Sequence, residues 1–140
     1  MKRGLPESKR LAVFVSQKWT VSTLLLSEPT LKSLQNLVGG YIEIVRPKGL
    51  PHPYVMIVDD EGKLKGKAVN KKASLIYGYA EHGKSIVGDV VIVKEIEDED
   101  GERDICTLDI SECEKVRDAL AKREFMLWPK THGKEDQVDG

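Results

Sequence analysis

The stretch LKSLQNLVGGYIEI, residues 31–44, decides the fold of this chain. Its first half carries an apolar side chain at each helical position of one face: Leu31, Leu34, Leu37 and Val38. The pair Gly39-Gly40 is typical of a helix end, because glycine accepts the left-handed backbone that closes a last turn. The β-branched run YIEIVRP (41–47) then indicates a strand. The sequence therefore predicts a short helix joined by two glycines to a strand.

Six further segments have the apolar or β-branched character of strands. They are LAVFVS (11–16), TVSTLLL (20–26), YVMIV (54–58), KLKGKAV (63–69), SIVGDVVIVKEIEDED (85–100) and ERDICTLDI (102–110). Acidic turns that contain a glycine, at 59–62 and 98–101, join two pairs of these segments. Tight turns connect antiparallel neighbours, so the sequence predicts a mostly antiparallel sheet.

Two more segments are predicted to be helical. NKKASLIY (70–77) fits either an extended segment or a short helix with Asn70 as its N-cap, and the spacing of its apolar residues favours the helix. The segment 112–125 follows a capping box of Ser111 and Glu114. The face of this helix that we expect to be buried consists of Cys113, Val116 and Leu120.

These elements predict one α+β domain, a two-layer sandwich of a mostly antiparallel sheet with two helices packed on it. A chain of 140 residues has the size of one domain. We expect the domain to span 1–128, since Trp128-Pro129 should stop the last helix. The polar residues 129–140 are predicted to be disordered.

The charge balance argues against several functions. Lys plus Arg number 22 and Asp plus Glu 23, a net charge of −1, so no overall field attracts nucleic acid. Five lysines within 63–72 keep nucleic-acid binding open as an alternative, although solvated loop charges explain them more simply. No apolar run is long enough to cross a bilayer, and the basic start of the chain lacks a signal peptide's apolar segment. We therefore expect a cytoplasmic protein without a membrane partner, and a homo-oligomer stays open.

No catalytic constellation is recognisable in the sequence. Asp59, Asp60 and Glu61 are adjacent carboxylates, but in a turn before a glycine they are expected to be solvated. The histidines are scattered, so no metal site is predicted, and no cofactor is expected. The cysteines Cys106 and Cys113 are expected to be free thiols.

The segment Gly78 to Ser85 spells the phosphate-loop pattern G-x-x-x-x-G-K-S. A true phosphate loop needs a helix that begins at the lysine, so that its N-terminus faces the phosphate. Here IVGDVVIV (86–93) follows, which is β-branched and broken by a glycine. We expect a loop that leads into a strand, and nucleotide binding or hydrolysis through this loop is kept as an alternative.

Spaced pieces of the chain resemble an uncharacterised small α+β domain family that is common in phages, plasmids and their bacterial hosts. The resembling pieces are VGGYIE (38–43), EGKL (61–64), Asn70 with Ala73, and Ile86 to Gly88, in that order. The resemblance covers about residues 11–94 and leaves 95–128, a predicted hairpin and helix, outside it. It implies an accessory protein of a mobile element, without known catalytic residues.

Our first hypothesis is a non-enzymatic accessory protein that binds a host protein or a small anionic ligand. Blunting a host defence is one role that such a protein could serve. Arginine, lysine and backbone N–H groups are the donors that bind anions in proteins. The candidate ligand-binding residues are Gly39, Gly40, Arg46, Asn70, Lys71, Lys72 and Lys84.

Overall fold

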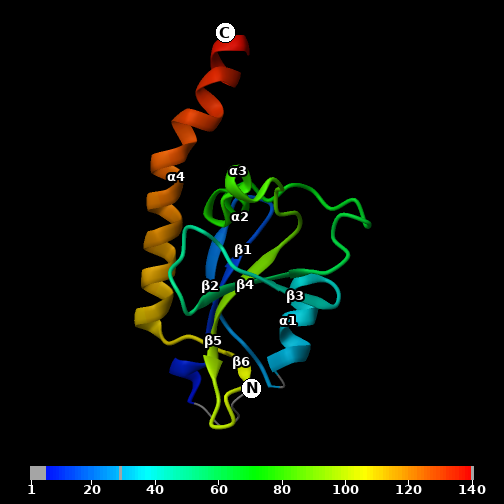
Figure 1. Ribbon diagram of the computed structural model, residues 1–140, viewed down its shortest axis with the longest axis vertical. Helices are drawn as coiled ribbons and strands as arrows, with labels where there is room; N and C mark the ends of the chain where they lie inside the picture. Colours follow the sequence, from blue (N-terminus) through cyan, green and yellow to red (C-terminus); the bar gives the residue numbers. More distant parts are fainter. Residues whose placement is uncertain (1–5, 29, 140) are drawn as a thin grey trace.

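The computed structural model describes residues 6–28 and 30–139, and the side chains of these ranges up to Glu124. The strands are β1 (Leu11–Val15), β2 (Val21–Leu25), β3 (Ile42–Val45), β4 (Tyr54–Asp59), β5 (Val90–Glu97) and β6 (Arg103–Cys106). The helices are α1 (Thr30–Val38), α2 (Lys71–Tyr77), α3 (Tyr79–His82) and α4 (Ile110–Asp139), with a 3-10 turn at Glu7–Lys9. The predicted α+β class is confirmed (Figure 1).

The strands form one open sheet in the order β2-β1-β5-β4-β3, and β6 also pairs with β5. The pairings between these strands are antiparallel, as predicted. Strand β5 organises the sheet, because its residues 90–92 pair with β1 and its residues 94–97 pair with β6. The predicted hairpin β5–β6 is present, and β1 and β2 are also antiparallel neighbours.

Helices cover both faces of the sheet. The domain therefore has three layers, one more than the predicted two-layer sandwich. On one face Leu34 of α1 packs in a cluster with Ile57 of β4. On the other face Val116 of α4 and side chains of α2 pack in a cluster with Met56. Figure 1 shows α1 and α4 on opposite sides of the sheet. The central strands require this cover because consecutive residues 90–93 of β5 are all buried.

The segment 63–69 is not the strand that the sequence predicted. Residues 60–66 form successive turns, and Val69 meets Val87 through an isolated β-bridge. Lys65 and Lys67 both reach back to the buried Asp59, which folds the segment over the end of β4. The predicted strand 85–100 is also shorter, and β5 begins at Val90 because the left-handed Gly88 (φ 77°) interrupts the extended chain.

Helix α4 is capped by a different pair of residues from the one predicted. Asp109 Oδ1 accepts a hydrogen bond from the Glu112 N–H at 2.8 Å, and Glu112 Oε1 accepts one from the Asp109 N–H at 3.0 Å. This capping box replaces the predicted pair of Ser111 and Glu114. The backbone pairing of Leu108 with Leu11 fixes where the chain leaves the sheet, and the helix begins directly afterwards.

The far end of α4 also differs from the prediction. The helix continues to Asp139, so the predicted end at Trp128-Pro129 is wrong: a proline removes one helical hydrogen bond and bends a helix, which can resume beyond it. The buried face of Cys113, Val116 and Leu120 is confirmed. The predicted disorder of 129–140 stays a prediction, because side chains beyond Glu124 lie outside the described part. Among the described residues, no helix combines the length and apolar character that crossing a membrane requires.

Candidate functional site

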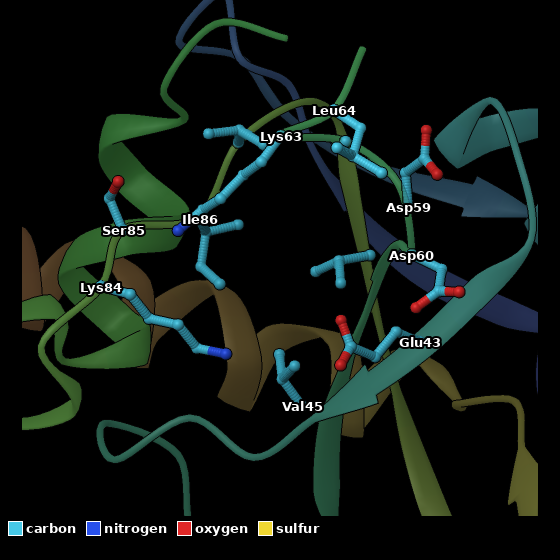
Figure 2. A pocket seen from close by; sticks show the side chains of 12 residues that line it. Glu43, Val45, Asp59, Asp60, Lys63, Leu64, Lys84, Ser85 and Ile86 are labelled. Atoms are coloured by element: carbon cyan, nitrogen blue, oxygen red, sulfur yellow. The ribbon is translucent and has the colours of Figure 1, made fainter. Parts of the chain in front are cut away.

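A pocket of about 160 Å³ lies between strands β3 and β4, the loop 60–64 and the segment 84–87 (Figure 2). We call it the mixed-charge pocket. Its charged lining consists of two lysines, Lys63 and Lys84, and three carboxylates, Glu43, Asp59 and Asp60. Its apolar lining consists of Val45, Val58, Leu64, Ile86 and Val87. The arrangement can therefore hold charged groups against an apolar wall.

The charged side chains enter the pocket from two sides. In Figure 2, Lys84 and Glu43 point toward one another from opposite sides of the hollow, with Asp60 near Glu43. Lys63 reaches toward the side of Ile86. None of these four side chains forms an ion pair within the part of the chain whose side chains are described. They are free to meet a ligand.

A buried ion cluster fixes the loop that carries one wall of this pocket. Asp59 Oδ2 lies 2.8 Å from Lys65 Nζ and 2.6 Å from Lys67 Nζ, and the carboxylate is only 1% exposed. Its Oδ1 accepts a hydrogen bond from the Glu61 N–H at 2.9 Å. We call Asp59, Lys65 and Lys67 the Asp59 cluster. Because Lys63 and Leu64 lie within the clamped loop, the cluster positions both of them.

The same cluster sets the ionisation of Asp59. Burial by itself raises the pKa of this carboxyl, but the hydrogen bonds from Lys65, Lys67 and the Glu61 N–H outweigh it and lower the pKa to about 2. Asp59 is therefore charged at every physiological pH. Its charge is fully engaged by the two lysines, and this carboxylate is not free for a ligand.

The predicted anion donors Gly39 and Gly40 serve the Asp59 cluster. Lys67 Nζ donates to the Val38 carbonyl at 2.6 Å and Lys65 Nζ donates to the Gly39 carbonyl at 2.9 Å, which satisfies carbonyls at the end of α1. Gly39 closes the helix in the left-handed conformation (φ 83°). A methyl group on Gly40 would lie 2.6 Å from Lys65 Nζ. The glycine pair thus makes room for the ammonium groups.

Arg46 and Asn70 are held within the fold. Arg46 binds both oxygens of Glu95, at 2.8 and 3.0 Å. Asn70 is fully buried and forms the predicted N-cap of α2, accepting from the Ala73 N–H at 3.1 Å. Its amide also donates to the carbonyls of Val15 and Gly88, at 2.9 and 2.8 Å. Asn70 thereby ties α2 to β1 and to the segment before β5, whereas the ion pair of Arg46 lies at the surface, with the arginine side chain 59% exposed.

The three predicted lysines have different surroundings. Lys72 pairs with Glu124 on α4 at 2.9 Å, and Lys71 is exposed at the start of α2. Lys84 lines the mixed-charge pocket. The structure therefore does not bring the predicted residues together, and it places Lys84 with Lys63, Glu43 and Asp60. The sequence marked Lys63 only as part of a lysine-rich segment and Asp60 only as a solvated turn carboxylate, and nothing marked Glu43, because exposed charged residues in a strand and a turn look like solvated surface.

The phosphate-loop pattern differs from the predicted loop in its first half, which forms a short helix, and agrees with the prediction after Lys84, where no helix follows. The short helix α3 lies inside the pattern, before Lys84, and the chain after Ser85 is extended through the bridge of Val87 with Val69. Ser74 Oγ accepts from the Ile86 N–H at 2.9 Å, which anchors this extended segment to α2. No helix begins at Lys84 to face a phosphate.

A second hollow of about 420 Å³ lies on the other side of the Asp59 cluster. Its lining is Gln35, Asn36, Gly39, Gly40, Tyr41, Glu61 and Lys65. Tyr41 is 73% exposed at its rim, and Leu64, in the loop between the two hollows, is 86% exposed. Within the described residues, no group of three or more His, Cys, Asp or Glu side chains is placed to hold a metal ion.

Comparisons with known proteins give a family match and no functional one. The family model of DUF3846, a domain of unknown function, matches residues 12–119. The match extends beyond the predicted limit of the resemblance, through β6 and into α4. No curated protein matches the chain. The crystal structure of the small RNA methyltransferase HEN1 is similar over 79% of this chain and 16% of its own, with a TM-score of 0.49 and 18% identity, and this likeness supports no inference about function.

Proposed function

We propose that this chain, which belongs to the DUF3846 family, is a non-enzymatic protein that binds a small anionic ligand in the mixed-charge pocket. The observation that supports the proposal is the pair Lys63 and Lys84, which line a pocket with an apolar wall and form no ion pair within the described part. The resemblance to phage and plasmid domains supports a role as a mobile-element accessory protein that blunts a host defence by binding.

The physical basis is the surroundings of the two ammonium groups. An ammonium beside an apolar wall attracts an anion more strongly than one surrounded by water, because the local dielectric constant is lower. Val45 and Ile86 provide such a wall. A hydrogen bond to a charged partner contributes about 1.5–3 kcal/mol, which suffices for reversible binding when two such contacts combine.

The alternatives have less support. Nucleotide hydrolysis through Gly78 to Ser85 lacks the helix that a phosphate loop requires. Nucleic-acid binding through the lysine-rich segment loses Lys65 and Lys67 to Asp59. A host protein is the second candidate, because the exposed side chains of Tyr41 and Leu64 offer apolar area to a partner.

The proposal is tested by titrating the labelled protein with inorganic phosphate and with 4-methylpentanoate while amide NMR signals are recorded. We expect shifts at the amides of the loop 60–64 and the segment 84–87. Lys84→Ala should weaken binding about tenfold. Lys71→Ala is the matched control, since Lys71 is an exposed lysine outside the pocket. Binding of neither anion, or equal weakening by both substitutions, would refute the proposal.

A further inference from the structure

We infer that the anionic group bound in the mixed-charge pocket is the carboxylate of a zwitterion: a free amino acid with an apolar side chain. This inference rests on the proposed function and names the ligand class of the same site. It follows from the two carboxylates, Glu43 and Asp60, that share the pocket with Lys63 and Lys84.

The charges of the pocket favour a dipole over a simple anion. Asp59 is neutralised by its own lysines, so the free charges are two ammonium groups and two carboxylates. A phosphate dianion would gain from Lys84 but would be repelled by Glu43 across the hollow. A molecule that carries both a carboxylate and an ammonium gains from both sides. Lys84 binds its carboxylate, and Glu43 binds its ammonium group.

The size of the pocket limits the ligand further. A cavity of roughly 150 Å³ holds one benzene molecule, whereas drug-sized ligands occupy roughly 300 Å³ or more. The mixed-charge pocket, at about 160 Å³, therefore suits a molecule the size of an amino acid and would not enclose a whole nucleotide.

The lining selects the side chain of the amino acid. Val45, Val58 and Ile86 belong to the apolar core of this face and reach the pocket wall. Burying an aliphatic side chain against them is favourable by about 25 cal/mol per Å² of apolar surface.

Calorimetry with three probes tests the inference: L-leucine, 4-methylpentanoate, which lacks the amine, and 3-methylbutylamine, which lacks the carboxylate. We expect leucine to bind at least about tenfold more tightly than either fragment. Glu43→Gln should reduce the affinity for leucine to that of 4-methylpentanoate and leave the affinity for 4-methylpentanoate equal or higher. Glu114→Gln is the matched control, because Glu114 is exposed on α4 and outside the pocket.

The outcomes separate the two claims. If 4-methylpentanoate binds as tightly as leucine and Glu43→Gln changes neither affinity, the amino-acid inference is wrong and anion binding stands. If neither leucine nor 4-methylpentanoate binds, the proposed function fails and the inference fails with it. Glu43 is exposed and makes no ion pair in the described part, so its substitution should leave the fold intact.

Discussion

Acidification should remove a measurable part of the folding free energy through Asp59. The pKa of this carboxyl is about 2 in the folded chain, against 3.8 for an unperturbed aspartate. A carboxyl whose pKa is lower in the folded than in the unfolded chain contributes its full stabilisation at pH values above the unfolded-state pKa. This contribution is lost as the pH falls toward the folded-state pKa. The difference corresponds to about 2 kcal/mol, of which about half is lost by pH 3.

The substitution Asp59→Asn isolates this contribution from that of every other carboxylate. At pH 7 it should destabilise the protein by about 3 kcal/mol, near the lower end for breaking a buried ion pair, because Lys65 is 42% exposed and can turn to water. Urea unfolding of both proteins between pH 7 and pH 2.5 measures the gap in unfolding free energy. We expect the gap to stay constant down to about pH 5 and then to shrink to about 1–2 kcal/mol at pH 2.5. A gap that does not change with pH would show that the Asp59 cluster does not stabilise the charged form.

Two further substitutions test the scaffold around the pocket. Gly40→Ala places a methyl group 2.7 Å from Asp59 Oδ1 and should cost about 1–3 kcal/mol in urea unfolding. A loss of no more than about 0.5 kcal/mol, the usual size for a surface substitution, would contradict crowding at Asp59. Asn70→Ala removes the cap of α2 and leaves two carbonyls without their donor, so we expect a loss of about 3 kcal/mol or more. A loss below about 1 kcal/mol in thermal and urea unfolding would contradict this role.

The sequence predicted the structure best where local features decide it, namely the spacing of apolar residues along a helix and the residues at the helix ends. The helix α1 and its end at Gly39 follow from apolar spacing and from the left-handed conformation that Gly39 adopts. The Asn70 cap of α2 was also predictable, because asparagine accepts a hydrogen bond from the first turn of a helix. The segment 63–69 was mispredicted because its lysines respond to Asp59, a partner that its own periodicity cannot reveal.

The pocket could not be predicted either, because the tertiary fold alone brings its residues together. Glu43, Lys63 and Lys84 are each about 20 residues apart along the chain, and each by itself has the character of a solvated charge. Only the register of the fold brings the segment 84–87 beside the loop 60–64, through the bridge of Val69 with Val87. Arg46 was predicted to bind an anion because of its side-chain chemistry. In the fold, it instead forms an ion pair with the carboxylate of Glu95.

The sequence pieces that carry the family resemblance include two of the proposed ligand contacts, Glu43 and Lys63, whereas Lys84 lies outside them. Gly39, Gly40 and Asn70 hold the backbone, and Gly88 leaves space for Lys67, since a methyl group there would lie 2.8 Å from Lys67 Cδ. Lys84 extends from a segment that Ser74 anchors independently. Because a surface substitution of this kind changes stability by only about 0.5 kcal/mol, loss of binding in Lys84→Ala would report a lost ligand contact and not a lost fold.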